Sequence, residues 1–138
     1  EVLPGLNVMA SATFYDAKLA NTAGGVNQGN DANGVPKRAF NLGADWELPW
    51  VPGLSVNARG IHTAATPYNA ENTLTLPSWT RVDVGGRYTT AIGGTPVVLR
   101  ASVENVFNKS YWLSSSALLT VGTVAAPRTV LLSAQFDF

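Results

Sequence analysis

The chain has 138 residues, of which 46% are hydrophobic and 13% are charged, and its nine basic and nine acidic residues cancel. The hydrophobic content excludes wholesale disorder, and a charged fraction about half the ~25% typical of soluble domains suits a membrane wall better than a solvated surface. The balanced charge without a Lys/Arg cluster argues against a nucleic-acid partner, and the absence of cysteine excludes disulfides, Fe–S sites and thiol catalysis.

The first residues and the hydropathy bear on how this chain relates to a larger protein. The sequence begins at Glu1 without a methionine, a basic segment or an apolar segment of the signal-peptide kind, so we expect a fragment of a mature protein. No window approaches the ~18 consecutive apolar residues of a transmembrane helix. A membrane β-barrel stays open, because its strands cross the bilayer by alternation.

Apolar residues recur at every second position in segments separated by Gly, Pro and Asn, which predicts β-strands. In chain order, six predicted strands cover residues 6–15, 38–48, 54–62, 80–88, 97–106 and 129–138. Each has about the 9–11 residues that a tilted strand needs to cross a bilayer. The sequence therefore predicts an all-β fold, an antiparallel up-and-down meander of about six strands, with residues 1–138 as one portion of a barrel domain.

Charged residues inside the predicted strands fall on one face, whereas the opposite face is expected to carry none. Ile61 breaks the alternation in the third predicted strand. A soluble antiparallel sheet with one wet face shows the same pattern, so alternation alone does not choose between a sandwich and a barrel. The charged positions are Asp45, Glu47, Arg59, Arg81, Asp83, Arg87, Arg100, Glu104 and Asp137.

The connections alternate in length, because residues 16–37, 63–79 and 107–128 form long loops and residues 49–53 and 89–96 form short turns. Outer-membrane barrels have long extracellular loops and short periplasmic turns. Aromatic residues then sort into two rims, as interfacial girdles do. The periplasmic rim would hold Trp46, Trp50, Tyr88, Phe136 and Phe138, and the outer rim Phe14, Tyr15, Phe40, Trp79 and Phe107.

A repeated segment supports an array of similar hairpins. Residues 3–10 read LPGLNVMA and residues 51–58 read VPGLSVNA, with a weaker third copy, TPVVLRA, at residues 95–101. Each copy places a proline-containing turn directly before a strand. The repeat therefore predicts one up-and-down hairpin unit used several times.

Three motifs resemble the end of TonB-dependent siderophore receptors. LPSWTRVDVGGRY at residues 76–88 resembles the family's LPSYTRVDLGARY strand, and VENVFNKSYW at residues 103–112 is similar to its V-x-N-L-F-[ND]-K-x-Y pattern. The ending, PRTVLLS at residues 127–133 followed by apolar positions through Phe138, stands in the expected order after them. The resemblance covers nearly the whole chain and implies the last six strands of a 22-stranded barrel, without the plug domain or the TonB box.

The resemblance also implies a function and its partners. The parent protein would take up ferric siderophore across the bacterial outer membrane with TonB-derived energy, would hold iron through the siderophore without a cofactor of its own, and would perform no catalysis. Its partners would be ferric siderophore, outer-membrane lipid, the TonB complex through the missing N-terminal plug, and the barrel-assembly machinery. That machinery would read the C-terminal strand signal, which here carries Phe136 and Phe138.

Two groups of side chains are candidates for function. Aromatic residues in or beside the predicted extracellular loops could contact an iron chelate, with interface anchoring as the alternative; they are Tyr68, Trp79, Tyr111 and Trp112. Charged residues of the fourth and fifth predicted strands could form a lumen-facing ladder in which opposite charges satisfy each other; they are Arg81, Asp83, Arg87, Arg100 and Glu104.

Other polar residues favour structural roles. Asn105 and the segment 107–109 are typical of a strand-to-loop exit, although ligand contact stays open. His62 is the only histidine and would need distant partners to bind a metal or act as a base. The Gly24-Gly25 and Gly93-Gly94 pairs lack a phosphate-loop pattern and are interpreted as flexible turns.

Two other functions compete with the receptor. A passive porin-type barrel would show the same alternation and girdles, and it would differ by lacking a plug and a TonB box upstream. A soluble all-β binding module could fold its six strands on themselves and would be monomeric in buffer, whereas an open barrel fragment would aggregate or pair through its edges.

Overall fold

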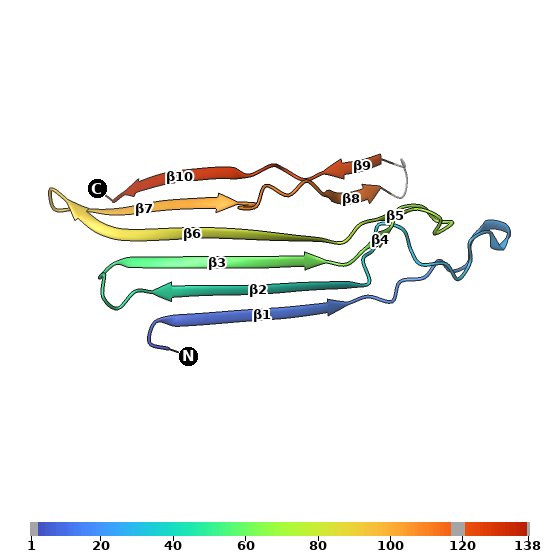
Figure 1. Ribbon diagram of the computed structural model, residues 1–138, viewed down its shortest axis with the longest axis horizontal. Helices are drawn as coiled ribbons and strands as arrows, with labels where there is room; N and C mark the ends of the chain where they lie inside the picture. The colour runs from blue at the N-terminus through green and yellow to red at the C-terminus, as the bar shows by residue number, and fades with distance from the viewer. Residues whose placement is uncertain (1–2, 117–120, 138) are drawn as a thin grey trace.

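The computed structural model, which describes residues 3–116 and 121–137, is built on one six-stranded antiparallel sheet (Figure 1). Every strand pairs only with the previous and the next strand of the sheet in chain order. This confirms the predicted all-β, up-and-down meander. The strands are β1 (Leu6–Phe14), β2 (Arg38–Glu47), β3 (Leu54–Thr63), β6 (Trp79–Ile92), β7 (Thr95–Glu104) and β10 (Thr129–Phe136).

The two kinds of connection gather at opposite ends of the sheet. Figure 1 shows both chain ends and the short turns β2–β3 and β6–β7 at one end, and all the long connections at the other. We call these the turn end and the loop end. In the described residues the only helix is a 3₁₀ turn, η1 (Ala23–Gly25), and no helix there is long and apolar enough to cross a membrane.

The predicted faces continue in register across the whole sheet. Residues directly opposite each other in an antiparallel sheet lie on the same face. One cross-strand row on the apolar face runs Trp46, Val56, Gly86, Ala101 and Leu132. The polar face carries a matching row of Glu47, Ser55, Arg87, Arg100 and Ser133.

Three residues at the loop end are exceptions to the division into an apolar and a polar face. Arg38 lies opposite Phe14, so the expectation that the apolar face carries no charge is wrong at the first residue of β2. His62 lies opposite Phe40 on the same face, and the two rings stack at 6.2 Å. Trp79 pairs with Thr63 on the polar face and therefore does not join an outer lipid-facing ring. Strand ends tolerate such exceptions because long polar side chains reach the interface there.

The sheet is a single layer with almost no core of its own. Among the described residues, Val97 and Tyr111 are the only buried hydrophobic side chains, whereas Leu132 on the apolar face is 77% exposed. A soluble domain packs a second layer on such a face. The exposed apolar face therefore fits lipid, and the soluble binding module would require a layer that the described residues do not form.

The repeated segment forms two equivalent turns. Leu6 N donates to Leu3 O and Leu54 N donates to Val51 O, and the intervening Gly5 and Gly53 have φ of 74° and 82°. Proline followed by a glycine of positive φ is the signature of a type II turn. Each glycine carbonyl also accepts a hydrogen bond from the adjacent strand of the sheet. Gly5 O accepts from Glu47 N of β2 at 2.9 Å, and Gly53 O accepts from Thr89 N of β6 at 2.8 Å. A Cβ at residue 53 would lie 2.3 Å from Thr89 O, so glycine is required there.

Some boundaries differ from the predicted ones. The turn expected at residues 89–96 is only Gly93-Gly94, both with positive φ, and β6 and β7 extend to meet it. Two positive φ values in succession make a type I′ hairpin turn, which twists with its strands. The long loops also contain short hairpins that the sequence did not predict: β4 (Thr66–Pro67) with β5 (Thr75–Leu76), and β8 (Trp112–Ser116) with β9 (Val121–Val124).

Candidate functional site

An ionic cluster occupies the polar face at the loop-end half of β3, β6 and β7. Asp83 accepts hydrogen bonds from Arg81 Nε at 2.6 Å and from Arg59 at 3.3 Å. Arg81 reaches Glu104 with its other nitrogen at 2.9 Å. The side chains of Asp83 and Arg81 are 14% and 20% exposed, so this network is largely shielded within the sheet. Its two acidic and two basic groups balance each other.

Arg87 and Arg100 do not join that cluster. They lie opposite each other in the β6–β7 register, closer to the turn end. Arg87 donates to Ser55 Oγ at 3.3 Å, and Arg100 donates to Gln135 Oε1 at 3.3 Å. The structure thus brings together three of the five predicted ladder residues, with Arg59 as an added member, and separates the other two.

Asn105 fastens the end of β7 to the last long loop. Its side-chain amide donates to Lys109 O at 2.9 Å and Ala126 O at 3.1 Å, and its Oδ1 accepts from Lys109 N at 2.9 Å. Its backbone N–H donates to Asp83 Oδ1 at 2.9 Å, which links this fastening to the ionic cluster. Asn105 is 2% exposed and has a φ of 52°, a conformation that asparagine tolerates better than most residues.

An aromatic pocket lies beside this fastening. Trp79 and Tyr111 stack with ring centroids 4.2 Å apart. Trp112 packs on the backbone of Gly122, where a Cβ would lie 2.8 Å from the indole. The pocket has a volume of about 380 Å³ and is lined by Pro77, Ser78, Trp79, Lys109, Ser110, Tyr111, Trp112 and Val124.

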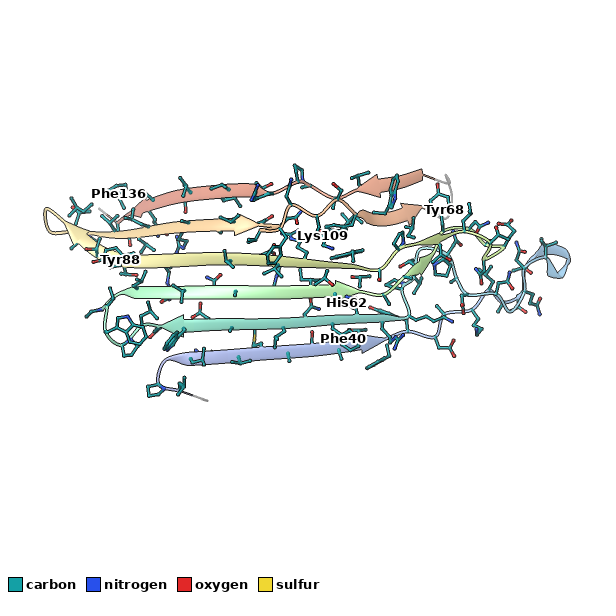
Figure 2. All side chains as sticks on the ribbon, viewed as in Figure 1. Phe40, His62, Tyr68, Tyr88, Lys109 and Phe136 are labelled. Carbon is teal, nitrogen blue, oxygen red and sulfur yellow. The ribbon has the colours of Figure 1, made fainter. Side chains whose placement is uncertain are left out.

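The four predicted ligand-contacting aromatics therefore divide. Trp79, Tyr111 and Trp112 share the aromatic pocket, and of these Tyr111 is 8% exposed whereas Trp112 is 45% exposed. The available aromatic surface is thus mainly that of Trp112. Tyr68 lies apart, on the β4–β5 hairpin, where its N–H donates to Leu74 O; Figure 2 shows it at the loop end.

A contact between the first two long loops was not predicted. Asn72 Oδ1 accepts from Asp31 N at 2.8 Å, and Asn72 Nδ2 donates to Asp31 O at 2.9 Å. The side-chain amide thus pairs with both backbone groups of Asp31, as a neighbouring strand would. Asn30 Nδ2 donates to Ala70 O at 3.0 Å nearby. Because these residues lie about forty positions apart in the chain, no local pattern points to them; the density of asparagine in both loops is the only sequence signal.

The Asp31 carboxylate also forms ion pairs with Lys18 and Lys37, which make the first long loop sensitive to pH. Hydrogen bonds from Lys37 and Lys18 lower the pKa of the Asp31 carboxyl from its usual 3.8. A lowered pKa in the folded state means that the ionic contact is complete above pH 3.8 and is lost as pH falls through the lower folded value. We expect hydrogen exchange of the segment 16–37 in the full-length protein to stay slow from pH 7 to about pH 4 and to accelerate below that range, after correction for intrinsic rates.

Asp31→Asn should remove that transition and speed exchange in the segment already at pH 7. Asp16→Asn is the matched control, because the Asp16 carboxylate is 85% exposed and lies 4.0 Å from Lys18. Equal exchange in wild type and Asp31→Asn would refute the role of the ion pairs.

The remaining predicted residues lie away from these contacts. Phe136 is in β10 opposite Val97, and Figure 2 shows it at the turn end with Tyr88. Phe138 lies outside the described residues. His62 Nδ1 lies 2.8 Å from Thr80 Oγ1. Within residues 3–116 and 121–137, no group of three or more His, Asp or Glu side chains could hold a metal ion.

Comparison with known proteins identifies the family. The family model described as TonB dependent receptor-like, beta-barrel, matches residues 4–106. The chain is 38% identical over 134 residues to the ferrichrome receptor FcuA of Yersinia enterocolitica, covering 97% of the chain and 18% of that protein. It is 32% identical over 139 residues to the ferrichrome outer membrane transporter/phage receptor of Escherichia coli (strain K12), covering 96% and 18%.

A solved structure agrees with the sequence relatives. BauA, the ferric preacinetobactin receptor from Acinetobacter baumannii, superposes with a TM-score of 0.89 at 37% identity, covering 99% of the chain and 20% of that protein. The chain thus spans about a fifth of the length of the relatives it matches. All three relatives are named as receptors or transporters, not as enzymes. The chain therefore belongs to the TonB-dependent receptor β-barrel family of the bacterial outer membrane, as its three motifs predicted.

Proposed function

We propose that the whole protein takes up a ferric siderophore across the outer membrane and that this chain forms the last six strands of its 22-stranded barrel. The observation that carries the proposal is the family match together with relatives that are named for ferrichrome and ferric preacinetobactin. The single-layer sheet with one apolar and one charged face supports it, because such a wall separates lipid from a wet lumen. The chain is proposed to contribute no catalytic step and no cofactor, since iron travels in the chelate.

The aromatic pocket is the proposed point of ligand contact in this chain. It lies at the loop end, which would face the outside, and its lining includes both the exposed Trp112 and the cationic residue Lys109. An aromatic face can contact the apolar or aromatic groups on the outside of a ferric chelate, and a cation can donate hydrogen bonds to its oxygen atoms. Tyr111 would act by holding the pocket through its stacking on Trp79.

The other partners are assigned by position. The apolar face would contact outer-membrane lipid, and Phe136 with Phe138 would present the C-terminal strand to the barrel-assembly machinery. TonB would act through an N-terminal plug that fills the lumen, so none of its contacts would fall on residues of this chain.

Growth under iron limitation tests the transport function. A strain deleted for the full-length gene should fail to grow on one ferric siderophore supplied as the sole iron source, and the intact gene should restore growth. Unchanged growth of the deletion strain on every chelate tested, in a strain without a second receptor, would overturn the proposal.

Trp112→Ala tests the pocket. We expect the concentration of chelate that gives half-maximal uptake to rise about tenfold, because one aromatic contact contributes about 1.5 kcal/mol. Trp50→Ala is the matched control, since Trp50 is 64% exposed at the turn end and should leave uptake unchanged. Equal uptake by the two variants would remove the pocket from the ligand path while leaving the transport function standing.

A further inference from the structure

Two guanidinium groups face each other on the polar side of the sheet without an opposite charge between them. Arg87 in β6 and Arg100 in β7 are directly paired in the register, and both are exposed on that face. Like charges directly opposite each other destabilise an antiparallel pair. The repulsion between the two arginines therefore needs an opposite charge from outside the sheet to offset it.

The wall itself neutralises this pair poorly. Arg100 has the neutral Gln135 as its partner at 3.3 Å, and within residues 3–116 and 121–137 no carboxylate lies within 4.0 Å of it. Arg87 has one carboxylate, Glu47, at 3.9 Å, and that side chain is 70% exposed. The ionic cluster nearer the loop end of the same face is neutralised within the sheet, because there Asp83 and Glu104 lie within 3.3 Å of the guanidinium groups of Arg59 and Arg81.

Small, uncharged residues lie next to the pair on the polar face. The neighbouring cross-strand row includes Asn57, Gly85 and Ser102, and the Asn57 amide lies over Gly85, where a Cβ would be 2.9 Å from its Oδ1. The Arg87 side chain is 45% exposed in the sheet. Both arginines are thus exposed on the polar face, where a segment crossing the lumen could meet the two guanidinium groups.

We propose that Arg87 and Arg100 together bind a carboxylate from the domain that fills the lumen of the whole receptor. This inference rests on the proposed function, which supplies such a domain. Once the lumen is filled, the two cations lose water, and buried charges require an opposite charge. Arginine suits that role because its planar fork donates two parallel hydrogen bonds to a carboxylate.

Zero-length coupling in the full-length receptor tests the contact. Arg100→Lys places a primary amine at the site, and a carbodiimide joins an amine to a carboxylate only when the two touch. We expect mass spectrometry to find residue 100 coupled to an Asp or Glu of the N-terminal, lumen-filling domain. Arg87→Lys should couple to the same acidic residue and serves as a second variant if the first assembles poorly.

Arg59→Lys is the matched control, because its neighbour Asp83 is in the wall itself at 3.3 Å from the arginine. It should give a coupling within the barrel and so establish that the reagent reaches this face. Coupling of residues 87 and 100 only to wall carboxylates such as Glu47 or Asp137, or to none while the control couples, would overturn the inference.

A charge-removal variant gives a second readout. In Arg87→Gln/Arg100→Gln, we expect protease to cleave the lumen-filling domain roughly tenfold faster than in wild type, the effect of losing one charge-assisted contact. Wild-type cells that take up no ferric siderophore would refute the proposed function. If wild-type cells do take it up, cleavage of the double variant at the wild-type rate, together with coupling of Arg100→Lys and Arg87→Lys only within the wall, would refute this inference alone.

Discussion

Asn105→Ala should be the most damaging single substitution on the described part of this chain. The change removes three side-chain hydrogen bonds at a position that is 2% exposed and leaves two carbonyls and one N–H of the loop without partners. It also puts alanine at a φ of 52°. We expect the free energy of unfolding to fall by about 3 kcal/mol or more, measured by urea unfolding of the full-length protein in lipid vesicles.

Two further variants separate the causes. Asn105→Gly loses the same hydrogen bonds but accepts the positive φ, so it should recover about 1 kcal/mol relative to alanine. Asn108→Ala has the same kind of backbone, with φ of 50°, but is exposed and loses only one hydrogen bond, to Arg128 N. A loss in Asn105→Ala no greater than that in Asn108→Ala would show that the buried amide is not what holds the loop.

Asp83→Asn should have the second largest effect. Asp83 joins Arg81, Arg59 and the N–H of Asn105, and asparagine keeps its volume and one acceptor while removing the charge. Breaking a fully buried ion pair costs about 3–5 kcal/mol, and the 59% exposure of Arg59 reduces this. We therefore expect a loss of about 2 kcal/mol in the same unfolding measurement.

Salt distinguishes a lost charge from disturbed packing. In 1 M NaCl, where the screening length is about 3 Å, the difference between wild type and Asp83→Asn should shrink. Asp45→Asn is the matched control on the same face, because Asp45 forms no side-chain hydrogen bond or ion pair within the described residues and should lose less than about 0.5 kcal/mol. A loss in Asp83→Asn that is the same at both salt concentrations would contradict an electrostatic role.

The sequence predicted the strand faces well because a period of two is a strong local signal. Val56, Ala58 and Gly60 could be assigned to one side of β3 without a structure, and the register then joined them to the apolar residues of β2 and β6. The strand ends were less certain. Thr89 to Ile92 lack clear alternation, so the pattern predicts a strand that stops at Tyr88, whereas β6 continues to Ile92 and the Gly93-Gly94 turn.

The grouping of the five charged ladder residues could be predicted only in part: Arg81, Asp83 and Glu104 come together, whereas Arg87 and Arg100 lie apart from them. Which arginine meets which carboxylate depends on the β6–β7 register, and a shift of a few residues exchanges Glu104 for Arg100 as the neighbour of an arginine in β6. The type I′ turn at Gly93-Gly94 fixes this register, and the Gly-Gly pair is its signal in the sequence. The contact between Asp31 and Asn72 could not be found in this way, since it joins two irregular loops.

The paired Pro-Gly turns have a consequence for how such a wall grows. Each turn is fixed by hydrogen bonds to its own strand and to the segment beside it, and all pairing in the sheet is between neighbours. Because each strand pairs only with its neighbours in chain order, a new strand can be added to the previous edge by closing one loop, and the entropic cost of that closure grows slowly with loop length. A barrel could therefore gain or lose a pair of strands by duplication or deletion of one unit, and every remaining side chain would keep its face.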